Sequence, residues 1–126
     1  MGDGTMMHIG ELAERTELSL RTIRHYDEIG LLEPSGRSEG GFRLYTEEDH
    51  DRLMLIRRMK PLGYSLEQMG DLLRAIDQAN TSGAAGDDAR RALGDFRADA
   101  EARRAKLAKQ LEAADEFIRQ LDPHAP

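Results

Sequence analysis

Apolar side chains recur at helical spacing near the amino terminus of the chain. Ile9 and Leu12 indicate a short helix that starts near Met7. Ser19 can cap a second helix over residues 20–28, because its hydroxyl accepts a backbone N–H that the first turn leaves unpaired. Two short helices separated by a tight turn predict a helix-turn-helix motif. The side chains that we expect on its inner face are Leu12, Leu18, Ile23 and Ile29.

A stretch with strand-like spacing follows this motif. We expect extended segments at 31–35 and 42–45, and the second of them, FRLY, alternates apolar and polar residues. Gly40 and Gly41 lie between the two segments and permit the positive φ values of a tight hairpin. A two-stranded ribbon is marginal alone, so it should lean on the helices as a wing.

Two further helices are predicted by their capping residues. Thr46 followed by three acids indicates a helix that runs to about Met59, and Pro61 should end it. Ser65 with Gln68 three residues later is a capping-box pattern that opens the next helix.

The carboxyl-terminal third of the chain predicts one long helix over residues 88–121. At about 1.5 Å per residue it would extend roughly 50 Å. One apolar seam repeats every seven residues, and further apolar side chains widen it. Its members are Leu93, Phe96, Ala100, Leu107, Leu111, Ala114, Phe117, Ile118 and Leu121.

A helix with one apolar stripe should not remain uncovered. The stripe can fold back on the small amino-terminal domain, or it can pair with a second chain in a coiled coil. The second interpretation is favoured because the helix is too long for so small a core to cover. Phenylalanines near both ends and an interruption at Arg103 suit an antiparallel pairing, although the spacing alone does not fix the polarity.

The amino-acid composition limits the cellular compartment and the kinds of site that we expect. The 126 residues include no Cys, which excludes disulfides and thiolate metal sites and is consistent with a reducing compartment. No apolar run approaches a membrane span, so we expect a cytoplasmic protein. Residues 1–50 carry 5 Lys/Arg against 11 Asp/Glu, so contact with nucleic acid would depend on locally placed cations.

Such cations are present on the second helix. Arg21 and Arg24 are three residues apart and therefore share a face, with Thr22 beside them. The first turns of the second helix are what a helix-turn-helix presents to the major groove, where arginine reads guanine. We therefore expect this face to contact DNA rather than to be an ordinary solvated surface.

The hairpin adds a second group of candidates. Arg37 and Arg43 flank its turn, and Tyr45 lies two residues beyond Arg43. Arginine and, more weakly, tyrosine can bind phosphates along a duplex. Tyr26 can place its ring in the core and its hydroxyl near a phosphate.

The motifs TIRHYDEIGLL and GGFRLYT, with the surrounding residues 7–76, resemble the DNA-binding domain of the MerR family of bacterial transcription regulators. The long helix resembles that family's dimerisation helix. The resemblance implies a homodimer joined by an antiparallel coiled coil. It also implies a pseudo-palindromic promoter with an overlong spacer, which the dimer distorts so that RNA polymerase can use it.

The resemblance also assigns site residues. It implies Arg21, Thr22 and Arg24 at the major groove, and Tyr26, Arg37 and Arg43 on the DNA backbone, with Tyr45 supporting the wing. Together with the cap at Ser19 these form the expected DNA-binding set. Phe42 stands where the family often has a tyrosine.

The predicted fold is mainly α. Residues 1–6 form a mobile leader, 7–76 a winged helix-turn-helix DNA-binding domain, 77–87 a linker, 88–121 a dimerisation helix that forms an antiparallel coiled coil, and 122–126 a tail.

Other functions find less support in the sequence. No nucleophile with a base and no glycine-rich loop before a helix indicates an enzyme, so we expect no catalytic residues. The four histidines have no ligand spacing, so neither a metal nor a cofactor is expected. Two alternatives remain: an excisionase-like protein that bends DNA, and a protein-interaction adaptor that acts through its long helix.

Overall fold

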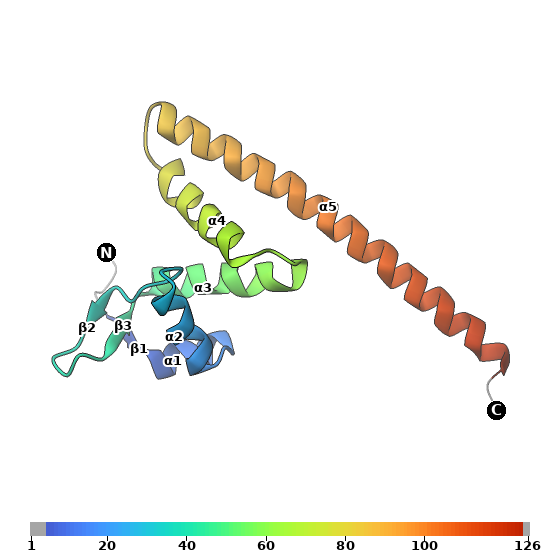
Figure 1. Cartoon of the computed structure of the whole chain (residues 1–126), viewed down its shortest axis with the longest axis horizontal. Helices are drawn as coiled ribbons and strands as arrows, with labels where there is room; N and C mark the ends of the chain where they lie inside the picture. Colours follow the sequence, from blue (N-terminus) through green and yellow to red (C-terminus); the bar gives the residue numbers. More distant parts are fainter. Residues whose placement is uncertain (1–4, 125–126) are drawn as a thin grey trace. The chain divides into compact units, whose positions relative to one another are not determined.

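The computed structural model describes residues 5–124 of the chain (Figure 1). Residues 1–4 of the predicted leader and 125–126 of the predicted tail lie outside this range. The structure is mainly helical with a small sheet, as the sequence pattern predicts. The elements in chain order are β1 (Met7–His8), α1 (Ile9–Thr16), α2 (Leu20–Glu28), β2 (Gly36–Arg37), β3 (Arg43–Tyr45), α3 (Glu47–Met59), η1 (Lys60–Leu62), α4 (Leu66–Ala79), α5 (Ala84–Leu121) and η2 (Asp122–His124).

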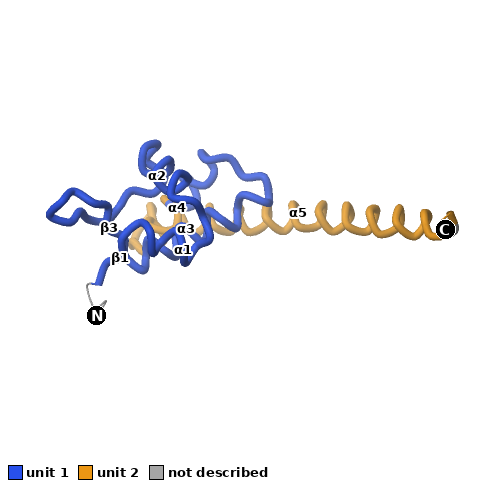
Figure 2. The backbone as a smooth tube through the Cα atoms, turned by 90° about the horizontal axis from the view of Figure 1, so that it is seen from below, with its two compact units in different colours: residues 1–73 blue, residues 74–126 orange. Residues whose placement is uncertain are grey.

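Figure 2 shows that the chain divides into two compact units, residues 1–73 and 74–126. We call the described part of the first unit, residues 5–73, the head. The second unit holds the end of α4, a short turn and α5.

The head has its own hydrophobic core. Helix α1 packs on both α2 and α3 and also contacts the sheet. Leu12 of α1, Ile23 of α2 and Leu53 and Ile56 of α3 are completely buried where these helices meet. Burying such a side chain contributes roughly 1.5–3 kcal/mol to folding, so these four residues account for much of the stability of the head.

The helix starts follow the predicted capping chemistry. The hydroxyl of Ser19 accepts from Thr22 N at 3.0 Å at the start of α2. Thr46 and Asp49 form a reciprocal capping box on α3, with Thr46 N donating to Asp49 Oδ2 at 2.9 Å. Ser65 and Gln68 form the same pattern ahead of α4, at 2.9 and 3.1 Å. All three caps are confirmed because capping depends on residues only a few positions apart.

The sheet has three strands where the sequence pattern predicts two. Its order is β1-β3-β2, and both pairs are antiparallel. Met7 of β1 pairs with Tyr45 of β3. The chain is therefore extended at Met7, and α1 begins only at Ile9. A strand of two residues is too short to leave a periodic pattern, which is why the sequence does not reveal it.

The first predicted extended segment, 31–35, is also not a strand. The backbone N–H groups of Leu31 and Leu32 both donate to the carbonyl of Tyr26, at 2.9 and 3.2 Å, and so turn the chain at the end of α2. Gly30 has φ +76°, the left-handed conformation that this turn requires. As a result Leu32 enters the core, whereas Ile29, which we expected to face inward, is 46% exposed.

The long helix begins earlier than the pattern predicts. Helix α4 continues to Ala79 and α5 starts at Ala84, so only four residues of the expected linker 77–87 lie between helices. A Cβ on Gly86 would lie 1.9 Å from the carbonyl oxygen of Thr81, so the first turn of α5 packs directly against this short turn. Arg90 donates to the carbonyl of Ala79 at 2.6 Å and so stabilises the turn between α4 and α5.

Candidate nucleic-acid interface

The outer face of α2 presents two free cations. Ile23 and Tyr26 point into the core, whereas Arg21 and Arg24 are exposed. Within residues 5–124 neither guanidinium has an ion pair or hydrogen bond with another part of the chain. Their donors are therefore available to an external acceptor.

Ser19 and Thr22 act on the helix itself. Besides accepting from Thr22 N, the Ser19 hydroxyl donates to Thr22 Oγ1 at 2.9 Å. Both side chains therefore cap the first turn of α2, which contains Leu20 and Arg21. This geometry fixes the direction in which the first turn, and Arg21 with it, is presented.

The wing arginines have an intramolecular partner that the sequence pattern did not reveal. Arg43 Nε donates to Asp27 Oδ2 at 2.7 Å, and Arg37 Nη2 lies 3.8 Å from the same oxygen. Arg37 Nη1 also donates to the carbonyl of Gly41 at 3.2 Å. The hydrogen bond to Asp27 raises the pKa of Arg43, so its positive charge persists.

The two tyrosine side chains are largely buried. Tyr45 is completely buried, and its hydroxyl has no hydrogen-bond partner, so in this structure it supports the wing from beneath and cannot touch a phosphate. Tyr26 is 5% exposed but lines the cleft described next. Burial raises the pKa of both hydroxyls, which keeps them neutral.

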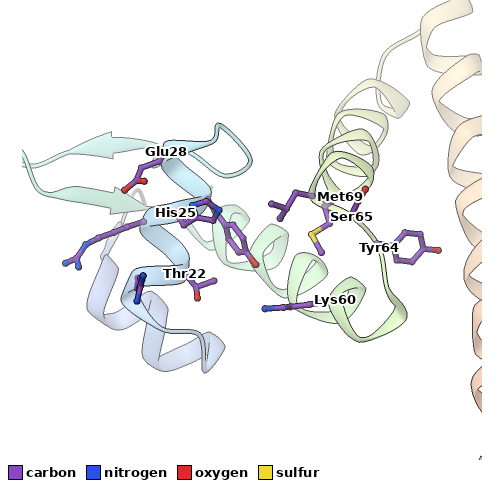
Figure 3. Close-up of a pocket in the computed structure, with 11 residues that line it drawn as sticks. Thr22, His25, Glu28, Lys60, Tyr64, Ser65 and Met69 are labelled. Atoms are coloured by element: carbon purple, nitrogen blue, oxygen red, sulfur yellow. The ribbon is translucent and has the colours of Figure 1, made fainter.

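A cleft of about 1020 Å³ lies between α2 and the segment that joins α3 to α4 (Figure 3). Arg21, Thr22 and Arg24 line it from α2, and Lys60 extends toward α2 from η1 (Figure 3). The sequence pattern did not reveal Lys60, because the position of this residue in the cleft depends on the 3₁₀ turn that follows α3. Three cations therefore share one cleft in the head.

Other kinds of site are not evident in the described residues. Residues 5–124 contain no group of three or more His, Cys, Asp or Glu side chains placed to hold a metal ion. In the same range no helix has a stretch long and apolar enough to cross a membrane.

Helices α1 and α2 joined by a tight turn, followed by a small antiparallel sheet, define a winged helix-turn-helix protein. The family model described as MerR HTH family regulatory protein matches residues 7–76. The chain belongs to this family.

Individual relatives agree with this assignment. The HTH-type transcriptional regulator ZntR of Escherichia coli (strain K12) is 50% identical over 68 residues, which cover 54% of this chain and 48% of ZntR. The chain thus aligns with about half the length of this relative.

Solved structures extend the likeness beyond the head. The N-terminal part of MtaN, the multidrug transporter activator of Bacillus subtilis, has a TM-score of 0.59 at 29% identity and covers 94% of this chain and 96% of its own. HiNmlR, a MerR family regulator lacking the sensor domain and bound to promoter DNA, has a TM-score of 0.73 at 22% identity and covers 94% of both chains. The second likeness concerns the fold alone.

Proposed function

We propose that this protein is a transcription regulator that binds a specific promoter sequence through the head and forms a homodimer through α5. The observation that supports it most is the pair of exposed, unpaired arginines on the outer face of α2, in a cleft that also holds Lys60. Residues 1–50 are otherwise rich in acids, so these cations are local rather than part of a general basic surface.

The roles of the head residues follow from their exposure. Arg21 and Arg24 read base edges in the major groove, with Thr22 beside them. Arg37 and Arg43 bind phosphates on the neighbouring backbone, and Lys60 binds phosphate from the other side of the cleft. Ser19, Tyr26 and Tyr45 hold these groups in place from the cap and the core.

Dimerisation is proposed from the uncovered stripe on α5. No residue over 104–122 is buried or half-buried, and the apolar seam members there are open to solvent. Leu111, Phe117 and Ile118 are 64%, 61% and 58% exposed. Burial of this seam against a second α5 removes it from water and gives the antiparallel coiled coil, with 88–121 as its main extent.

The promoter mechanism is proposed from membership of the family. Two heads on one dimer recognise two inverted half-sites, and the bound dimer distorts an overlong spacer so that RNA polymerase engages both of its elements. The relative ZntR is itself named a transcriptional regulator.

Selection of duplexes from a random DNA pool, followed by footprinting, tests the proposal. We expect the chain to select an inverted repeat and to protect both half-sites. The variant Arg21→Ala with Arg24→Ala should lose at least about 30-fold in affinity, since each base-reading arginine contributes roughly 1–3 kcal/mol and the two together at least about 2 kcal/mol. The matched control is Arg97→Ala, an exposed arginine of α5.

The result that contradicts DNA recognition is equal affinity of the double variant and the control for every selected duplex. Transcription with purified RNA polymerase on a promoter that contains the selected site then separates two classes of DNA-binding protein. A regulator changes the amount of transcript, whereas a protein that only bends DNA leaves it unchanged.

A further inference from the structure

We propose that Asp27 is a positioning residue for DNA binding, which locks the wing to the recognition helix α2 by holding Arg37 and Arg43 on one carboxylate. The inference rests on the proposed function, because it concerns how the same interface is assembled. Asp27 lies in the last turn of α2, and both arginines belong to the sheet.

The wing needs such a lock because its own strands are short. Strand β2 has two residues and β3 has three. Arg37 and Arg43 are direct cross-strand partners, and like charges in that relation repel. A carboxylate near both guanidiniums attracts each of them and lowers the net charge of the group from +2 to +1.

The Asp27 carboxylate is well placed for this role. Its side chain is 15% exposed and that of Arg43 is 26% exposed, so solvent and salt screen the pair less than an ordinary surface ion pair. Both arginines approach the same oxygen, Oδ2. The contact joins residues that are 16 positions apart and belong to different elements, so it constrains the wing relative to α2.

The geometry also leaves the arginine free to bind DNA. Asp27 occupies only the Nε donor of Arg43. Within residues 5–124 no hydrogen bond is formed by the two terminal nitrogens of Arg43. Those nitrogens can donate to a phosphate oxygen while Nε remains on Asp27. A guanidinium is required for this double use, since a lysine offers a single nitrogen.

Two views of Asp27 predict opposite results. If it were only an anion beside the DNA backbone, its removal would strengthen binding by relieving repulsion with phosphates. If it positions the wing, Asp27→Asn weakens binding despite the gain in positive charge. The expected loss is about 10-fold, and the slope of log affinity against log salt should fall by about 1 to 2, since each lost phosphate contact removes about 0.9.

The test uses the full chain and a duplex that the wild-type chain has selected from a random pool. Affinity is measured over a range of salt for Asp27→Asn, Asp27→Glu, Arg43→Gln and the combination of Asp27→Asn with Arg43→Gln. Glu33→Gln is the matched control, because it removes the same charge from an exposed head residue that does not line the cleft and has no ion pair or hydrogen bond within residues 5–124. Thermal melting confirms that each variant is folded.

We expect Glu33→Gln to bind at least as tightly as the wild type, and Asp27→Glu to recover part of the loss caused by Asp27→Asn. The double variant should lose less affinity than the two single losses together, because both changes break the Asp27–Arg43 contact, while Asp27→Asn also releases Arg37. Binding by Asp27→Asn as tight as that of Glu33→Gln overturns the inference. If Asp27→Asn does not fold, an unchanged salt slope for Arg43→Gln overturns it instead.

The two proposals fail in different ways. If the wild-type chain selects no duplex, the proposed function is wrong and the role of Asp27 in DNA binding is wrong with it. If the wild type binds and Asp27→Asn binds equally well, only the role of Asp27 is wrong.

Discussion

The head and the carboxyl-terminal half of α5 differ in how far their apolar side chains are exposed to solvent. In the head, Leu12, Ile23 and Leu53 are completely buried by other parts of the same chain. In α5, Leu111 and Ile118 are more than half exposed. The core of the head is therefore covered by the same chain, whereas the stripe on α5 is left uncovered by it. This difference separates the residues that hold the fold from those that we propose to assemble a dimer.

The largest effect should come from charging the seam. Leu111→Asp with Ile118→Asp places unpaired charges in the proposed interface and should weaken dimerisation by at least about 3 kcal/mol, or 100-fold. Lys109→Asp, off the stripe, is the matched control and should remain dimeric. Analytical ultracentrifugation measures both, and a double variant that sediments like the control would show that the stripe is not the interface.

A cavity in the core sharpens the same comparison. Leu53→Ala should destabilise the head by about 2–5 kcal/mol, because the side chain is completely buried. Its melting temperature should fall at every protein concentration. Leu111→Ala should instead lower only the midpoint of the transition that depends on protein concentration, which reports dissociation of the proposed dimer. The comparison breaks down if Leu53→Ala changes the dimer equilibrium more than the melting of the head.

Two glycines of α5 should respond with opposite signs. Gly86→Ala forces a Cβ against the Thr81 carbonyl and should cost about 1–3 kcal/mol. Gly94→Ala meets nothing within 4 Å and should gain about 0.5–1 kcal/mol, because alanine is less flexible in the unfolded chain. Helix content and thermal melting by circular dichroism check both. The same sign for both variants would argue against the tight corner at Thr81.

An effect as small as that of Gly94→Ala concerns the cap of α2. Ser19→Ala removes the acceptor for Thr22 N and should cost about 1 kcal/mol. Ser82→Ala, in the exposed turn before α5, is the control and should change stability little. Hydrogen exchange at the first turn of α2 reports the effect directly, and equal exchange in the two variants would count against the cap.

Local sequence patterns predicted the helices, and also the starts of α2, α3 and α4. Ser19, Thr46 and Ser65 cap helices through bonds to residues three positions away, so the sequence alone carries that information. The pattern failed where distant residues decide the outcome. Strand β1 exists only because Met7 reaches Tyr45, and Leu32 rather than Ile29 enters the core because of the turn at Gly30.

The candidate site shows the same division. Helical spacing was enough to identify Arg21 and Arg24 as an exposed pair. It did not reveal that Arg43 pairs with Asp27 or that Lys60 enters the cleft, because both depend on how separate elements pack. Tyr45 lies in β3 and is fully buried, and this burial depends on the third strand, which the pattern did not show.

The number of chains bound to one selected duplex tests the central claim most directly. Sedimentation of the full chain with a duplex that contains the selected inverted repeat should give two chains per duplex. Arg21→Ala with Arg24→Ala should remain a dimer but leave the duplex free. One chain per duplex, or a double variant that still binds, would contradict the account of two heads joined by α5 that hold DNA through these arginines.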